Sequence, residues 1–173
     1  MGLAARRASF AVKARTAMQI DFQTPDDWRF ISDQVMGGVS TGGVDFHGTG
    51  GRHFATLVGD VSTENNGGFI QIRRDVDGLP AGATAMVLTV RGNGAAYKVH
   101  LRTRQSERPW HYFAASFDAP AEWTDITLPL ADFAPNKDHL QAPVRPTEVR
   151  SIGIVAYGAD YHANLDIAGI VLR

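Results

Sequence analysis

The stretch AYKVHLRTR, residues 96–104, decides the fold class of this chain. Its apolar residues fall on one side of an extended backbone and its basic residues fall on the other. The apolar side carries Tyr97, Val99 and Leu101, and the opposite side carries Lys98, His100, Arg102 and Arg104. Alternation with a period of two is typical of a strand that buries one face. The stretch therefore predicts a β-strand with a basic outer face.

Further stretches of strand-like composition lie on both sides of it, at spacings of roughly ten residues. They are residues 53–61, 67–76, 84–92, 110–117, 123–130, 150–158 and 164–173. Turns rich in Gly, Pro, Asn and Asp separate them, and no amphipathic helix is evident beyond a short helical turn near Leu130–Phe133. The pattern predicts an all-β fold, an antiparallel jelly-roll β-sandwich.

Length and composition limit the function classes. The 173 residues suggest one domain, and 44% hydrophobic residues are ordinary for a globular protein. Cysteine is absent, which excludes disulfides, thiolate metal sites and a Cys nucleophile, and agrees with an intracellular protein. No apolar run approaches the roughly 18 residues of a membrane span.

Residues 1–19 differ in composition from the rest, which we expect to form the domain, residues 20–173. They contain four basic residues and no acid, namely Arg6, Arg7, Lys13 and Arg15. Three interpretations stay open: a mitochondrial presequence, a loosely structured extension, or translation from a start upstream of Met18.

The segment ISDQVMGGVS, residues 31–40, is unusual because it is rich in Gly yet carries Met36 in its middle. A phosphate-binding loop would need a Lys and a following helix, and neither is present. Residues 38–42 fit Gly-x-Ser-x-Gly, but the strand-to-helix context of a nucleophile elbow is missing around Ser40. A structural turn or a partner-binding loop remains, with Asp33 or Ser32 capping the turn.

Other motifs are weaker. Asn65-Asn66-Gly67-Gly68 is typical of a hairpin turn. The six histidines lack zinc-ligand spacing, no oxygen-rich calcium loop stands out, and no nucleic-acid-binding motif is present. The region 73–108 is rich in Arg and Lys, which indicates either an anionic partner surface or a solvated face balanced by neighbouring acids.

Several blocks of the chain resemble the family of thirty-kilodalton complex I intermediate-associated proteins. They are WRFISDQVMGGVS (28–40), GDVSTENNGGFIQIR (59–73), VRGNGAAYKVHLRT (90–103), WTDITLPLADFAP (123–135), IGIVAYG (152–158) and LDIAGI (165–170). The resemblance implies a galactose-binding-like jelly roll and a non-enzymatic, chaperone-like role in assembling NADH:ubiquinone oxidoreductase. The third block departs from the family, since Asn93 stands where Asp is usual.

We therefore predict a protein-binding assembly factor without catalytic residues, cofactor or metal. Its surface is expected at the rim formed by 32–40, 65–68 and 91–94, beside the basic strand face. The predicted partner-binding residues are Asp33, Met36, Gly37, Gly38, Ser40, Asn65, Asn66, Arg73, Arg91, Asn93, Lys98, Arg102 and Arg104. The expected partners are respiratory complex I subunits or assembly intermediates, without nucleic acid and without a direct membrane span.

The expected location is the bacterial cytoplasm, with membrane association through partners, or the mitochondrial matrix in a eukaryote. The alternative function is a carbohydrate-binding module of the same fold. In that case Trp28, Trp110 and Trp123 are candidates to stack on sugar rings, although large aromatics at strand positions more often belong to the core.

Overall fold

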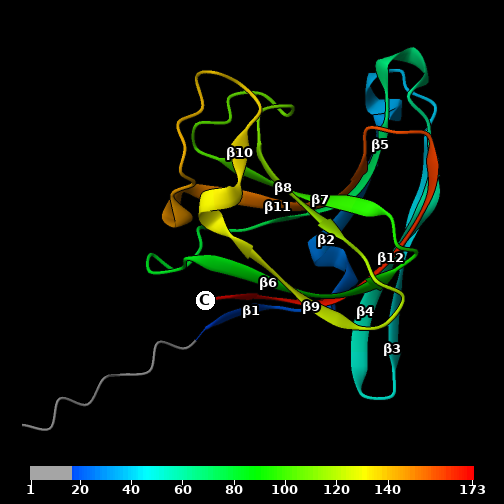
Figure 1. Ribbon diagram of the computed structural model, residues 1–173, viewed down its shortest axis with the longest axis horizontal. Helices are drawn as coiled ribbons and strands as arrows, with labels where there is room; N and C mark the ends of the chain where they lie inside the picture. The colour runs from blue at the N-terminus through cyan, green and yellow to red at the C-terminus, as the bar shows by residue number, and fades with distance from the viewer. Residues whose placement is uncertain (1–16) are drawn as a thin grey trace, which may run out of the picture.

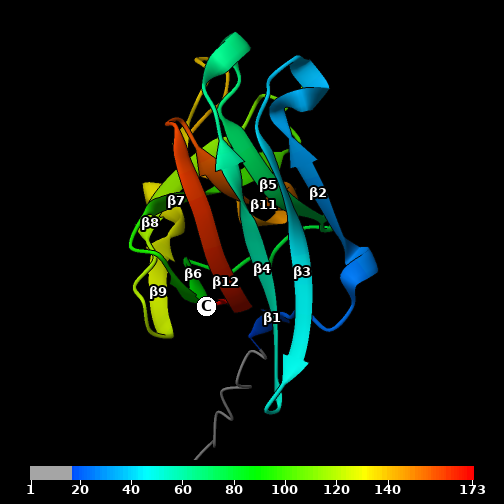
Figure 2. The same ribbon diagram turned by 90° about the vertical axis from the view of Figure 1, so that its right-hand side faces the viewer.

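A computed structural model describes residues 17–173, which form two antiparallel sheets packed face to face (Figure 1). The first sheet has the order β3-β4-β12-β6-β9, and β1 pairs with β12. Its strands are β1 (Met18–Ile20), β3 (Thr41–Thr49), β4 (Arg52–Val61), β6 (Ala85–Gly92), β9 (Thr124–Pro129) and β12 (Tyr161–Leu172). Figure 2 shows β3, β4 and β12 side by side in this sheet.

The second sheet has the order β10-β8-β7-β11-β5-β2. Its strands are β2 (Trp28–Ser32), β5 (Phe69–Asp75), β7 (Ala96–Thr103), β8 (Phe113–Asp118), β10 (Ala134–Pro135) and β11 (Val149–Tyr157). Short 3-10 turns occur at Pro25–Asp27, Asp33–Met36, Glu64–Asn66, Leu130–Asp132 and Pro146–Glu148. Residues 17–173 contain no helix long and apolar enough to cross a lipid bilayer.

The core lies between the two sheets and follows from the alternation of each strand. Ile70 and Ile72 of β5, Val99 of β7, and Ile152 and Ile154 of β11 are all fully buried. Because each such side chain contributes about 1.5–3 kcal/mol when it leaves water, the alternating strands fix which face of the sheet turns inward. The opposite face of the same strands is then left for polar side chains.

Tyr97 is a polar exception inside this core, because its ring is fully buried and its hydroxyl is fully bonded. The hydroxyl donates to Asn93 Oδ1 at 2.7 Å and accepts from the Asn164 N–H at 2.9 Å. It thereby links the β6–β7 connection to β12.

Tyr97→Phe is expected to lower the free energy of unfolding by about 1–2 kcal/mol, because two buried hydrogen bonds are lost at unchanged ring volume. Urea denaturation measures the effect. Tyr161→Phe is the control, since the Tyr161 hydroxyl makes one longer bond, to the Ala96 carbonyl at 3.3 Å. Equal losses in the two variants would contradict this role for Tyr97.

The jelly-roll prediction is confirmed, and each of the eight predicted strand stretches contains a strand. The interpretation of residues 65–68 as a hairpin turn was wrong, because β4 and β5 lie in different sheets. The backbone preference was correct, since Asn65 and Asn66 have φ of 57° and 58°. The sequence interpretation missed β1, β2, β3 and β10. Residues 1–16, which hold most of the expected basic extension, lie outside the described residues.

Candidate functional site

The outer face of the second sheet forms a groove of about 760 Å³. Residues of β5, β7 and β11 that point away from the core make its floor. The 3-10 turn after β2 lines one side, and the connections before β8 and after β10 line another. A concave sheet face bounded by loops is a general site for ligands in folds of this kind.

The register places three rows of side chains across the groove floor, and the upper row consists of Gln71, Val155 and Lys98. In the middle row, Gly153 of β11 lies between Arg73 of β5 and His100 of β7. In the row below, Ser151 of β11 lies between Asp75 of β5 and Arg102 of β7. The end of the Gln71 side chain lies over Gly153, since a Cβ there would be 2.8 Å from the Gln71 Oε1 atom.

His100 lies on the groove floor and is held in place by an aromatic neighbour. Its ring stacks on Tyr112 with centroids 3.7 Å apart and planes at 11°. Burial lowers the pKa of His100 to about 3, and the charges of Lys98 and Arg73 add to this effect. The imidazole is therefore neutral at physiological pH.

Three polar atoms of the groove lack hydrogen-bond partners. In residues 17–173, four buried side-chain N or O atoms make no hydrogen bond, and three of them are His100 Nε2, Arg102 Nε and Ser151 Oγ. The fourth, Trp28 Nε1, does not line the groove. Buried polar groups without a partner are uncommon in folded proteins. Their concentration in one groove marks this surface as the candidate binding site.

The groove also carries positive charge that is not held in ion pairs, although the charge of Asp75 partly offsets that of Arg73. Within the described part of the chain, Arg73, Lys98 and Arg102 form no ion pair. Burial lowers the pKa of Arg73, with further contributions from the charges of Arg102 and Arg29. Arg29 is itself paired with Asp75 at 3.1 Å. An anionic group in the groove would relieve the repulsion between Arg73 and Arg102.

Apolar side chains border the same groove. Five large hydrophobic residues are exposed among residues 17–173, and four of them line it: Val35, Met36, Trp110 and Tyr157. Val35 and Met36 are 76% and 60% exposed. An apolar rim around a positively charged floor is typical of a surface that binds an amphipathic partner.

The turn that presents Val35 and Met36 is anchored by a buried carboxylate. Asp33 is fully buried and accepts hydrogen bonds from the Ser40 hydroxyl at 2.6 Å, the Ser40 N–H at 2.9 Å and the Gly68 N–H at 2.6 Å. Burial alone would raise the pKa of Asp33, but these hydrogen bonds outweigh it and lower the pKa. The turn therefore rests on an ionised carboxylate that ties it to the start of β5.

Glycines make room for this carboxylate. A Cβ at Gly38 or at Gly67 would overlap the Asp33 side chain. Gly37 ends the turn in the left-handed region, at a φ of 88°, which glycine adopts without strain. The Ser32 hydroxyl caps the turn by accepting from the Gln34 N–H at 3.4 Å, as expected from the sequence.

The same geometry argues against a nucleophilic Ser40. The residue is fully buried, and its hydroxyl contacts Asp33 and the backbone of Ser62. A serine nucleophile needs a general base that takes its proton, which is usually a histidine.

Within residues 17–173, no three His, Cys, Asp or Glu side chains gather closely enough to hold a metal ion.

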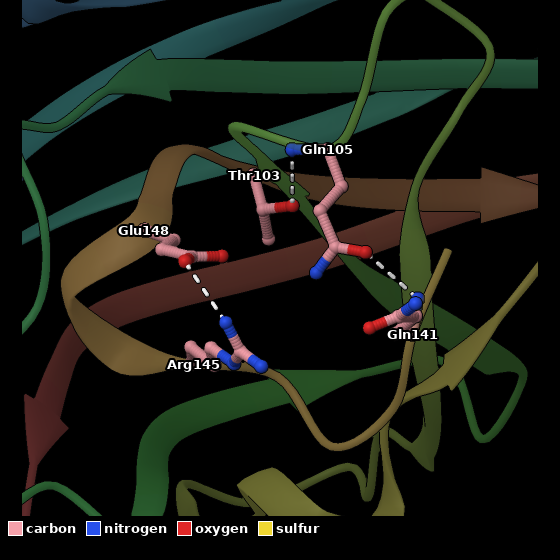
Figure 3. A network of polar contacts seen from close by, with 5 residues as sticks. All are labelled: Thr103, Gln105, Gln141, Arg145 and Glu148. Carbon is pink, nitrogen blue, oxygen red and sulfur yellow. Dashed lines mark hydrogen bonds and ion pairs between the residues drawn. The ribbon is translucent and has the colours of Figure 1, made fainter. Parts of the chain in front are cut away.

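A second polar network lies in the connections that follow β7 and β10 (Figure 3). Gln105 Oε1 accepts from the Gln141 N–H at 2.8 Å, and Thr103 Oγ1 accepts from the Gln105 N–H at 3.2 Å. Arg145 and Glu148 pair at 3.5 Å near the end of the same connection. The bond between Gln105 and Gln141 joins the segment after β7 to the segment after β10, and Trp110 and Lys137 of these two segments line the groove.

A family model for complex I intermediate-associated protein 30 matches residues 18–167, nearly the whole described chain. The chain belongs to this family. The 28–40 and 59–73 blocks, which carried the resemblance in sequence, form the Asp33 network and the adjoining strands of this family member. A search of curated proteins found no match.

Solved structures similar to this family member include carbohydrate-binding modules. The family 11 module of Clostridium thermocellum, in complex with a mixed-linked β-1,3-1,4 tetrasaccharide, has a TM-score of 0.71 at 14% identity over 90% of this chain and 93% of that chain. The family 11 module of the cellulase Lic26A-Cel5E has the same TM-score at 13% identity, over 91% and 94%. A family 30 module has a TM-score of 0.55 at 14% identity, over 79% and 92%. At such identities the likeness shows the fold alone.

The predicted partner-binding residues of this complex I intermediate-associated protein 30 family member separate into three groups. Met36, Asn66, Arg73 and Arg102 line the groove, and Lys98 lies on the same strand face. The second group lies next to the groove: Asn65 and Gly37 are in the two adjoining 3-10 turns, and the buried residues Asp33, Gly38 and Ser40 shape the turn Asp33–Met36. Arg91, Asn93 and Arg104 do not line it.

Two of those outlying residues have other partners. Arg91 pairs with Asp166 of β12 at 2.7 Å, in the first sheet. The Asn93 amide donates to the His162 carbonyl at 2.8 Å.

The sequence interpretation missed Val35, Gln71, Tyr112, Ser151, Gly153 and Tyr157 as groove residues. A signal existed in 150–158, because Ser151, Gly153, Val155 and Tyr157 share one strand face, but their mixed polarity concealed it.

Proposed function

We propose that this protein is a non-enzymatic binding factor that holds a segment of a partner protein in the groove during assembly of respiratory complex I. Family membership supports the assembly context. The observation that carries the binding role is the groove itself, where exposed apolar side chains surround a positively charged floor with unpartnered polar atoms. In this proposal the protein meets the respiratory membrane through its partner.

The composition of the rim favours a polypeptide as the occupant. Val35 and Met36 are aliphatic and largely exposed, and such side chains bind other apolar side chains. The thioether of Met36 adapts to partners of different shape. Acidic residues in the bound segment would complement Arg73 and Arg102, which have no acidic neighbour in an ion pair.

Val35→Asp is expected to reduce recovery of complex I subunits about tenfold when the tagged full chain is used to capture partners from native membranes. The reason is that one buried apolar contact is replaced by an unpaired charge, and about 1.4 kcal/mol corresponds to tenfold in affinity. Mass spectrometry of the captured subunits measures the effect. The control is Val39→Asp, since Val39 is 41% exposed on the same loop and does not line the groove. Absence of respiratory subunits with the unmodified protein would contradict the proposal.

A carbohydrate-binding role is the second candidate. Its specific support is the aromatic set Trp110, Tyr112 and Tyr157 around the groove, together with the amide of Gln71 on the floor. Aromatic rings beside amide groups are a common way to bind sugar rings. Calorimetric titration with neutral oligosaccharides distinguishes the candidates, because a sugar-binding module binds them without any protein partner. Binding that Trp110→Ala abolishes would favour this second role.

A further inference from the structure

We infer that the groove floor contains a carboxylate-binding subsite formed by Arg73, Arg102, Ser151 and His100, which takes an acidic side chain or the terminal carboxylate of the partner segment. This inference rests on the proposed function, because it names the chemistry of the ligand at that groove. It also makes a claim that can fail while the groove still binds a partner through its apolar rim.

The donors converge from two sides of one strand. Gly153 of β11 lies directly between Arg73 and His100, and Ser151 lies directly beside Arg102. The charges of Arg73 and Arg102 are close enough to disfavour each other. The missing side chain at Gly153 makes room between these donors for the mobile end of Gln71, which a ligand would displace.

The unpartnered atoms point to a ligand rather than to a simple solvated surface. Ser151 is 2% exposed and His100 is 8% exposed, yet Ser151 Oγ and His100 Nε2 make no hydrogen bond to the described protein. Arg102 Nε is buried and also unbonded, while its terminal nitrogen donates to the Arg108 carbonyl at 3.3 Å. An exposed face would leave these groups to bulk water, but here they are covered.

A carboxylate matches this set of donors. Its two oxygens accept about four hydrogen bonds, and Ser151 Oγ, Arg102 Nε, a neutral His100 Nε2–H and the Arg73 guanidinium can supply them. Arginine binds carboxylates in a planar fork, and hydrogen bonds to charged groups are stronger than those between neutral groups. Within residues 17–173 no acid forms an ion pair with either arginine, and Asp75 acts on Arg73 only from beyond ion-pair distance, so an anionic ligand would supply complementary charge.

The positive charge of the groove floor also disfavours binding of the first 16 residues of the same chain. The first 16 residues carry Arg6, Arg7, Lys13 and Arg15 and no acid, so their charge has the same sign as that of the floor. A ligand of opposite sign is needed, which a separate acidic segment provides.

The test uses two matched peptides, acetyl-Leu-Glu-Leu-Glu-Leu-amide and its counterpart with Gln in place of Glu, titrated into the full ¹⁵N-labelled chain. We expect the acidic peptide to shift the amide resonances of Ser151 and Gly153 and to bind at least about tenfold more tightly than the neutral one. Arg102→Gln and Arg73→Gln should each weaken the acidic peptide about tenfold. Arg104→Gln is the matched control, since Arg104 is exposed and does not line the groove.

Stability separates a binding role from a structural one. Arg102→Gln removes a buried unbonded nitrogen and a like-charge repulsion, and it loses one exposed hydrogen bond of 3.3 Å to the Arg108 carbonyl, so its melting temperature should stay close to that of the unmodified chain. Gly153→Val should also fold, because the atom nearest to its Cβ is the mobile end of Gln71, and it should block the subsite. A large drop in melting temperature for Arg102→Gln would assign the arginine to the fold and overturn the inference.

Three results would overturn the subsite. They are equal binding of the acidic and neutral peptides, no binding of the acidic peptide up to about 10 mM, and binding of trigalacturonate in preference to both peptides. The last result would assign the same donors to an acidic glycan. If capture of complex I subunits from membranes depends on Val35 but not on Arg102, the proposed function stands and the carboxylate subsite falls.

Discussion

Asp33→Asn is expected to lower the free energy of unfolding by about 3 kcal/mol, because a buried charged acceptor is replaced by an amide. The Asp33 carboxylate accepts from the Ser40 hydroxyl and from the backbone N–H groups of Ser40 and Gly68. Asparagine has one acceptor oxygen, and its NH₂ group would face donors that it cannot satisfy. Urea denaturation followed by tryptophan fluorescence measures the loss.

The control for this prediction is Asp160→Asn. Asp160 is exposed and accepts from the Thr63 N–H at 2.7 Å and the Thr63 hydroxyl at 2.9 Å, on the neighbouring turn. We expect a clearly smaller loss there, because water can replace both bonds. Equal stabilities for Asp33→Asn and the unmodified chain would mean that the buried carboxylate does not hold the turn.

Partner binding should fall together with stability in the Asp33 variant, since Val35 and Met36 lie on the turn that Asp33 anchors. The hydrogen bonds that lower the pKa of Asp33 also make the stability of the protein depend on pH. A carboxyl whose folded-state pKa is depressed stabilises the protein above its unfolded pKa, which is about 4. That contribution is lost as the pH falls through the lower, folded-state value.

His100 is expected to make the protein lose about 2 kcal/mol of stability between pH 7 and pH 5, relative to a His100→Phe variant. Burial, aided by Lys98 and Arg73, lowers its pKa from 6.5 to about 3. Between these two values the unfolded chain binds a proton at His100 and the folded chain does not. Stability from this group is therefore complete above pH 6.5 and is lost progressively down to pH 3.

Phenylalanine is the matched replacement because it keeps a flat ring over Tyr112, which stacks on His100 with centroids 3.7 Å apart. Urea denaturation of both proteins at several pH values measures the difference in slope. The groups that face His100 at this site are Lys98, Arg73, Tyr112 and Tyr157. Parallel curves for the two proteins would contradict a buried, neutral His100.

The location of the binding site depends on contacts between distant segments. The sequence interpretation selected Arg73, Lys98 and Arg102 by their charge and alternation, and the structure places them on one face of adjoining strands. It also selected Arg91, which pairs with Asp166 in the other sheet. Alternation tells which side of a strand a residue takes, but it does not tell which strands become neighbours.

The motif at 31–40 shows the same division. Its glycines and polar residues predicted a turn, which is confirmed by the 3-10 turn Asp33–Met36. Nothing in the local sequence reveals that Asp33 reaches the Gly68 N–H, 35 residues away in the chain. Local patterns encode backbone preference, whereas the burial of a carboxylate depends on which distant segment packs over it.

The sequence by itself determined the all-β class, eight strand stretches, the family and the direction that each side chain of β7 takes, because these follow from local alternation and from motifs. Only the tertiary structure decided that β11 separates β5 from β7, which gathers Arg73, His100, Arg102 and Ser151 around Gly153. The physical reason is that strand order is set by the packing of the whole core and by the chain connections, and no single strand contains that information.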